Sequence, residues 1–250
     1  MVRGLYIAGT GMMLQRRQME IVTNNVANAD TIGYKKDYLL SHSFDSVLVR
    51  RINDAGSRPY APVGPLHLGT QVDQKHINFD NGSIEVTERP TDLALIGDAF
   101  FVVETADGER YTRNGAFYID SHGYLVDGSG NFLLGQNGEI YVGGLNFSVS
   151  EQGVVWVDNQ PVDTIRVVSF EDNQQLRKQG SSLFYSTAEP LGEANPYIVR
   201  QGALEASNVD IGREMVDMIT LYRTYEANQR MVTLIDESVG KAVNEIGRLR

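Results

Sequence analysis

The residue types that most often carry out chemistry are scattered along this sequence and form no spaced motif. The four histidines are His42, His67, His76 and His122. None lies three or four residues from another, the spacing that places two metal ligands on one helical face. The chain has no cysteine, which excludes disulfides, zinc–thiolate sites and thiol nucleophiles. No G-x-S-x-G nucleophile turn and no P-loop occurs. We therefore expect no catalytic residue, no metal ligand and no cofactor.

Carboxylates are the one reactive group in excess. The chain has 32 Asp and Glu against 22 Lys and Arg, a net charge of −10. A carboxylate pair for glycoside hydrolysis could assemble in space, but no spacing singles one out. The acidic balance argues against nucleic acid as a partner, and no motif indicates a small-molecule substrate. Residues 1–60 carry +3 and the remainder −13. Solvated faces account for this difference, and the alternative is that oppositely charged surfaces of neighbouring subunits meet.

Residues 5–26 have the apolar period of a helix. One row with a spacing of seven residues consists of Leu5, Met12, Met19 and Val26, and a second row on another face consists of Ile7, Leu14 and Ile21. Beside the first row, Ala8 and Val22 are apolar, but Gln15 interrupts them. A helix with two apolar faces is either buried completely in its own chain or has a further partner in a neighbouring subunit.

The same periodicity returns from Asn208 to the C-terminus, where Asn208 or Asp210 can cap a helix. A row with a spacing of seven residues comprises Ile211, Met218, Tyr225, Val232, Val239 and Ile246. Its companion row comprises Met215 and Tyr222 early, then Leu221, Ile235, Ala242 and Leu249, a drift expected of a straight helix. At 1.5 Å per residue this helix would be roughly 55–60 Å long, which is too long for one β domain to cover. We expect the N-terminal helix to be its partner.

From about residue 69 to residue 200 the apolar period is two, as in strands. Strand-like runs occupy 93–96, 100–103, 124–126, 154–157 and 164–170. The pairs between runs are Asn81-Gly82, Asp107-Gly108, His122-Gly123, Asn137-Gly138 and Gln152-Gly153, of which the Asn-Gly and Asp-Gly pairs favour hairpin turns. Residues 54–65 are rich in Pro and Gly and indicate a loop.

These patterns predict an α+β protein. The N- and C-terminal helices would pair in a coiled-coil-like domain formed by residues 1–34 and 205–250. Residues 35–80 would be an extended connector and loop, and residues 81–204 a β-rich, mostly antiparallel outer domain. The opening residues become charged too soon for the apolar core of a signal peptide, and no run reaches transmembrane length, so we expect no cleaved signal.

Three blocks of the sequence resemble the axial proteins of the bacterial flagellum, the family of rod and hook subunits, and within it the rod proteins. The first block is 24–35, the second is 92–126, and the third is 201–209 with 225–228. Their signature residues are Asn24, Asn25, Asn28, Gly33, Tyr34, Gly97, Phe100, Phe101, Gly115, Phe117, Gln201, Gly202, Leu204, Ser207, Asn208, Tyr225, Glu226 and Asn228. The blocks span nearly the whole chain in the family's order. The opening Met1-Val-Arg-Gly-Leu-Tyr is similar to the distal-rod branch, the modest length favours rod over hook, and Tyr222 departs from the Gln often found there.

The resemblance implies a structural subunit of the flagellar basal-body rod and no enzymatic activity. Its partners would be itself, other rod and hook subunits, and the flagellar type III export apparatus. The subunits would form a hollow tube that transmits torque and carries the export channel. The assembly interface would comprise Leu5, Met12, Met19, Val26, Ile211, Met215, Met218, Tyr222, Tyr225, Val232, Val239 and Ile246. Phe44 and Leu48 fit the spacing of an early export signal. The alternatives are a hook or other axial subunit, or a secreted β-rich surface binding module.

Overall fold

The computed structural model describes residues 2–50, 62–186, 190–191 and 196–246. The chain forms two compact units. The helical unit contains residues 1–24, 37–76 and 212–250, and the β unit contains 25–36 and 77–211. Most of the predicted loop at residues 54–65 lies outside the described residues. An α+β fold with two terminal helices and a central antiparallel β region is confirmed.

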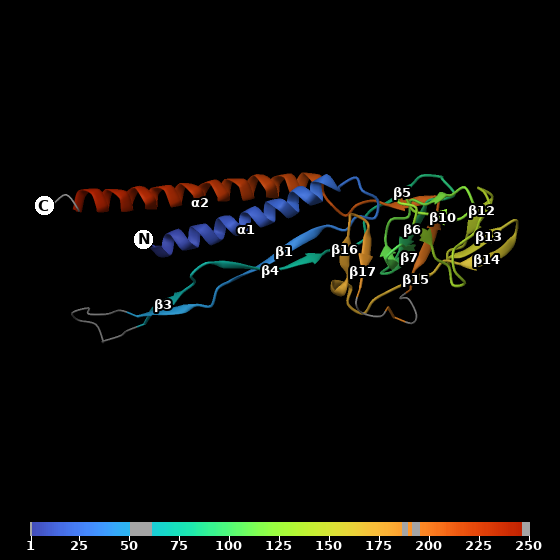
Figure 1. Cartoon of the computed structure of the whole chain (residues 1–250), viewed down its shortest axis with the longest axis horizontal. Coiled ribbons are helices and arrows are strands. Elements are labelled where there is room, and N and C mark those ends of the chain that lie inside the picture. The colour runs from blue at the N-terminus through green and yellow to red at the C-terminus, as the bar shows by residue number, and fades with distance from the viewer. Residues whose placement is uncertain (1, 51–61, 187–189, 192–195, 247–250) are drawn as a thin grey trace. The chain divides into compact units, whose positions relative to one another are not determined.

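The helical unit holds helices α1 (Val2–Ala27) and α2 (Ile211–Ile246). The two helices run antiparallel and side by side (Figure 1). They contact each other where Gly4 lies against Ile235 and where Asn228 donates a hydrogen bond to Gln15 over 3.0 Å. Coiled-coil pairing along their length remains a prediction. Neither of these helices has an apolar stretch long enough to cross a membrane.

Residues expected to form an extended connector hold four strands of the helical unit. They are β1 (Asp37–Ser43), β2 (Val47–Arg50), β3 (Pro62–Leu66) and β4 (Thr70–Ile77). β1 pairs with β4, and β2 pairs with β3 in antiparallel register. Lys75 forms an ion pair with Asp37 at 2.6 Å, and the ring of Phe44 lies 6.3 Å from that of Tyr6 on α1. Two-stranded ribbons are marginal alone, so these strands depend on such contacts.

The β unit is built from antiparallel pairs. Its largest sheet has the order β16-β17-β8-β7-β11-β10-β9, with β15 also on β7, and β12-β13-β14, β18-β6 and β19-β5 form smaller sheets. The strands are β5 (Ile84–Val86), β6 (Leu93–Ile96), β7 (Phe100–Thr105), β8 (Gly108–Thr112), β9 (Tyr118–Ile119), β10 (Leu125–Val126), β11 (Phe132–Leu133), β12 (Phe147–Val149), β13 (Val154–Val157), β14 (Gln160–Thr164), β15 (Val167–Val168), β16 (Arg177–Gln179), β17 (Leu183–Tyr185), β18 (Ile198–Gln201) and β19 (Ala203–Glu205). A short 3-10 helix covers Asn173–Gln175.

Strand β7 lies at the centre of this unit because both of its faces are buried. Phe101 and Val103 join one apolar cluster, with Leu93, Phe117 and Val199 among its members. The alternate residues, Phe100 and Val102, join a second cluster formed with Leu134, Phe170 and Phe184. Successive side chains of a strand point to opposite faces, so an unbroken apolar run is the pattern of a strand covered on both sides.

The turn pairs of the sequence have two different roles. Asp107-Gly108 closes the hairpin between β7 and β8, as expected, and Gly108 has a φ of 99°. The hairpin expected at Asn81-Gly82 is wrong, because β4 and β5 pair with other strands. Gly82 is needed for a different reason: a Cβ there would collide with the carbonyl of Ala206. The chain passes too close to its neighbour for any side chain.

Replacing Gly115 by Ala tests this close packing. A Cβ on Gly115 would collide with the carbonyl of Leu93, whereas a Cβ on Gly144 would meet no atom within 4 Å. Neither glycine has a positive φ, so the pair isolates steric contact. We expect Gly115→Ala to lower the free energy of unfolding by about 1–3 kcal/mol or more.

The matched control is Gly144→Ala, which should change stability by less than about 1 kcal/mol. Urea unfolding followed by the fluorescence of Trp156, the chain's one tryptophan and part of the β unit, measures both variants. Equal stabilities of the two variants would contradict the close approach at Gly115.

Candidate functional site

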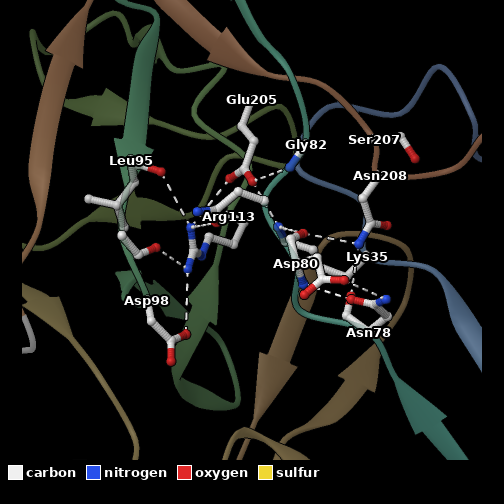
Figure 2. Close-up of polar contacts among 12 residues, drawn as sticks. Lys35, Asn78, Asp80, Gly82, Leu95, Asp98, Arg113, Glu205, Ser207 and Asn208 are labelled. Atoms are coloured by element: carbon white, nitrogen blue, oxygen red, sulfur yellow. Dashed lines mark hydrogen bonds and ion pairs between the residues drawn. The ribbon is translucent and has the colours of Figure 1, made fainter.

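A buried carboxylate on β19 joins three distant stretches of chain within the β unit. The side chain of Glu205 has no exposed surface. Its Oε1 accepts hydrogen bonds from Lys35 Nζ at 2.7 Å and from the backbone N–H of Gly82 at 2.9 Å (Figure 2). Its Oε2 lies 3.4 Å from Arg113 Nη1. We call Lys35, Arg113 and Glu205, together with Asn208, the Glu205 junction.

The turn that follows α1 carries Lys35 into the junction. Backbone hydrogen bonds from Thr31 to Asn28 and from Tyr34 to Thr31 fold the chain back after the helix. Gly33 then donates its N–H to the backbone carbonyl of Glu205 at 2.7 Å. Gly33 has a φ of 66°, and a Cβ there would collide with the backbone of Arg113. Only glycine satisfies both conditions, which places Lys35 two residues later at the carboxylate.

Arg113 follows β8 and is buried among backbone carbonyls. Its Nη2 donates to Gly97 O at 2.6 Å, and its Nη1 donates to Leu95 O at 3.3 Å. The guanidinium lies 5.0 Å from the centre of the Phe100 ring, within the range of a cation–π contact. Asp98, which is half exposed, lies 3.8 Å from Nη2. Arg113 therefore holds the chain around β6 and β7 to the carboxylate.

Asn208 completes the junction from the segment before α2. Its Oδ1 accepts from the backbone N–H of Lys36 at 2.8 Å, and its Nδ2 donates to the carbonyls of Asn78 and Asp80 at 2.9 and 3.0 Å (Figure 2). One amide thus satisfies one backbone donor and two acceptors. Of the two residues expected as a cap of α2, Asn208 uses its side-chain oxygen to accept from the N–H of Lys36, and Asp210 is the one directly before the helix. Lys178 also binds this turn, because its Nζ lies 3.9 Å from the centre of the Tyr34 ring and donates a hydrogen bond to the backbone carbonyl of Lys35.

Glu205 is the carboxylate that faces both buried cations of the junction. Burial lowers the pKa of Lys35, and the neighbouring Glu205 carboxylate opposes that shift. Burial likewise lowers the pKa of Arg113, again against the attraction of Glu205. Removing charges from water costs several kcal/mol per ion, and close pairing with additional hydrogen bonds offsets this cost. With both oxygens occupied by donors, Glu205 is arranged to hold chain segments together. Among the described residues, no three His, Asp or Glu side chains gather in a way that could hold a metal ion.

The family signature residues fall in both units. From the first block, Gly33 and Tyr34 lie at the junction, and Tyr34 donates its hydroxyl to the buried Asn25 at 3.2 Å. From the second, Phe100 and Phe101 are buried in the core. Gly97 lies against the backbone of Pro196 and Gly115 against the backbone of Leu93, too close for a Cβ atom. From the third, Leu204 and Asn208 flank Glu205. The structure does not bring Tyr225, Glu226 and Asn228 to this place, because they lie on α2 in the helical unit.

The predicted assembly residues divide by exposure. The exposed ones are Leu5, Ile211, Met215, Tyr222 and Val239. The half-buried ones are Met12, Met19, Val26, Met218, Tyr225 and Val232. Ile246 ends α2, and its side chain lies outside the described residues. Phe44 is half-buried and Leu48 is exposed on β2. Further exposed apolar residues, absent from the predicted set, are Tyr6, Ile7, Met13, Val216, Ile219, Met231, Leu234 and Val243.

The three charged residues of the junction were missed as site residues by the sequence reasoning, although each lies in a different family block. Lys35 ends the first block, Arg113 lies in the second and Glu205 in the third. A usable signal existed, because Glu205 interrupts the apolar run of a short strand next to Leu204. A charge at a strand position that is otherwise apolar requires a partner when it is buried. The partner itself, 170 residues away in the case of Lys35, has no local signature.

Comparison with known proteins assigns the same three regions to one class. Residues 5–35 match the model of the flagella basal body rod protein. Residues 94–157 match the flagellar hook protein FlgE/F/G D1 domain, and residues 200–245 match the flagellar basal body rod FlgEFG protein C-terminal region. The fold and these three matches therefore assign the chain to the class of flagellar rod and hook subunits.

Similarity to individual relatives extends over the whole chain. The flagellar hook-basal body complex protein FlhO of Bacillus subtilis is 34% identical over 100% of both chains. The flagellar basal-body rod protein FlgG of the same organism is 32% identical over 98% of this chain and 99% of its own. FlgG of Borreliella burgdorferi is 32% identical over 98% of each chain. This chain belongs to the flagellar basal-body rod protein family, whose members are structural subunits.

The stability lost on substitution in the junction should depend on how many buried charges lose their partner. Glu205→Gln leaves Lys35 and Arg113 as two buried cations without their carboxylate, so we expect a loss of about 3–5 kcal/mol in unfolding free energy. Lys35→Met should cost less, because Glu205 and Arg113 remain as a one-to-one pair. Urea unfolding followed by Trp156 fluorescence measures both.

The control is Glu109→Gln, which breaks the exposed pair with Arg166 within the β unit. Surface pairs of this kind contribute less than about 1 kcal/mol. A cost for Glu205→Gln no greater than that of the control would show that the junction does not stabilise the β unit.

Proposed function

We propose that this structural rod subunit self-assembles through α1 and α2 into a hollow helical tube that transmits torque and carries the export channel. The observation that carries the proposal is the exposed apolar surface of the two helices. On α2 it includes Met215, Val216, Ile219, Tyr222, Met231, Leu234, Val239 and Val243, and on α1 it includes Leu5, Tyr6, Ile7 and Met13. Met215, Ile219 and Tyr222 are exposed at successive three- or four-residue spacings on α2, and clustered exposed apolar side chains mark interaction surfaces.

Geometry explains why one chain does not cover this surface by itself. Helix α2 has 36 residues and α1 has 26. At 1.5 Å per residue, α2 extends about 15 Å beyond the length that α1 can match. A helix also presents several faces, of which one partner covers only one. In the proposed assembly, residues 1–34 and 205–250 form a coiled-coil-like inner domain, residues 35–80 a connector, and residues 81–204 the outer part.

The proposed partners are further copies of this chain and other rod and hook subunits. Relatives named as rod proteins and as hook-basal body complex proteins support this choice. Similarity to FlgG proteins along nearly the whole chain supports a place in the distal rod. A hook subunit is the alternative, since one matching model names the hook protein, but the full-length relatives favour the rod.

The proposed route out of the cell is the flagellar type III export apparatus, without cleavage of a signal. Phe44 and Leu48 would serve as the export signal. Leu48 is accessible on β2, whereas Phe44 is half-buried beside Tyr6. Recognition of both residues therefore requires a chain in which the Phe44–Tyr6 contact has not formed. This requirement agrees with export of an unfolded chain.

Substitution of an exposed apolar residue tests the interface. Leu234 is 58% exposed, so an acidic residue there disturbs little within one subunit. We expect Leu234→Asp to leave β-unit unfolding unchanged and to reduce polymerisation at least about tenfold, because it would bury an unpaired charge between subunits. Electron microscopy and sedimentation of concentrated protein measure the polymer.

The neighbouring polar position supplies the control. Thr233 is also exposed, and Thr233→Asp adds the same charge one residue away. It should polymerise much more readily than the Leu234 variant. Equal polymerisation of the two variants would count against an apolar interface on this face.

The free subunit provides a second test. Long helices with uncovered apolar faces are marginal in water, so we expect the ends of the chain to be ordered mainly in the assembly. Trypsin should cut the free subunit at Arg16, Arg17, Arg223 and Arg230 much faster than within the β unit. Protection of all four sites in the monomer would overturn this expectation, and the same digestion of polymer serves as the comparison.

A further inference from the structure

The seam between α1 and α2 contains one inter-helix hydrogen bond between two amide side chains. Asn228 Nδ2 donates to Gln15 Oε1 at 3.0 Å, and both side chains are half-buried. Gly11, one turn before Gln15, makes room for this pair, because a Cβ there would lie 3.1 Å from Asn228 Nδ2. Asn228 therefore packs over the backbone of α1 between two successive turns.

The two amides occupy equivalent places in their helices. On α1, Gln15 lies seven residues from the buried Ala8 and seven from the buried Val22. On α2, Asn228 lies seven residues from Leu221 and seven from Ile235, which are both half-buried. Each helix thus presents apolar, polar, apolar at heptad spacing. The two polar interruptions of these rows are the residues that meet.

We propose that the Gln15–Asn228 pair sets the register of the helix pair. In the observed antiparallel register, Gln15 meets Asn228. Sliding one helix by a heptad would place Gln15 at Leu221 and Asn228 at Ala8, or, in the other direction, Gln15 at Ile235 and Asn228 at Val22. Each amide would then be desolvated against an apolar side chain without a partner, which disfavours the slipped pairings. The apolar rows alone would accept them, since apolar residues repeat every seven positions.

A register determinant matters because a slip would move every exposed apolar residue of one helix by about 10 Å relative to the other. The surface offered to neighbouring copies depends on both helices together. The inference rests on the proposed pairing of α1 and α2 in the working subunit and adds the residues that select one pairing among several. Single buried polar residues specify the register of coiled coils in the same way.

Cross-linking of the full chain reads the register directly. The chain has no cysteine, so introduced thiols are unique. Gly4→Cys with Ile235→Cys reports the observed register, because Gly4 lies against Ile235. Gly4→Cys with Ala242→Cys reports a slip of one heptad. A short bismaleimide is applied at low protein concentration, where it traps the pairings that the two helices sample in the free subunit, and only product of monomer mass is counted.

Replacing both amides removes the discrimination. In Gln15→Leu/Asn228→Leu we expect the ratio of slipped to observed cross-link to rise roughly tenfold or more relative to the natural pair. The matched control, Arg16→Leu/Gln229→Leu, changes two exposed neighbours and should leave the ratio unchanged. The exchanged pair, Gln15→Asn/Asn228→Gln, keeps two amides and should retain the observed register.

Three results would overturn the proposal. They are an unchanged ratio in the double-Leu chain, loss of the observed register in the exchanged pair, and no 4–235 cross-link with the natural amides. Polymer formation is scored separately by electron microscopy. A chain that keeps its register but does not polymerise contradicts the proposed function and leaves this inference standing.

Discussion

A carboxylate removed from water must recover its hydrogen bonds and counter-charges inside the protein, and this requirement organises the β unit. Glu205 recovers them from Lys35, Gly82 and Arg113, which come from three separate stretches of chain. The turn after α1, the strand region around β6 to β8 and the segment before α2 are therefore held at one point. Removing Glu205 would leave Lys35 and Arg113 as buried cations without their carboxylate, so the junction favours the one arrangement in which all three residues meet.

Much of the fold was predictable because it is written in local periodicity. Heptad rows located both helices, and the apolar run at 100–103 indicated a strand, although only the structure shows that both of its faces are buried. The pair Asn81-Gly82 predicts a hairpin that does not form, because glycine is used both in tight turns and where two backbone segments pack closely, as Gly82 does against Ala206. The junction was not predictable, because Lys35 and Glu205 meet only after 170 residues of chain have folded. On α2, the half-buried face includes Leu221 and Asn228 whereas Met215 and Tyr222 are exposed, a distinction that needs the position of α1.

The two units differ in how they bury their apolar side chains. The β unit closes two apolar clusters on either side of β7 and pairs the buried carboxylate of Glu205 with Lys35. The helices leave apolar side chains exposed along both α1 and α2, and the β unit also exposes some, among them Val86 and Leu145. In the proposed assembly, the helices would supply the contacts between subunits while the β unit keeps its own core. The polar pair at Gln15 and Asn228 gives that open surface a defined geometry.

The backbone passes between the two units four times, after residues 24, 36, 76 and 211. The first passage lies inside α1, and the fourth lies at the first turn of α2. A force that pulls the two units apart would therefore act on four connecting segments of the backbone and not on a single linker. Near three of these passages the Glu205 junction fixes residues 33–36, 78–82 and 205–208 to one another. A pull on any one of these three segments is therefore shared with the other two through the hydrogen bonds and the ion pair of the junction.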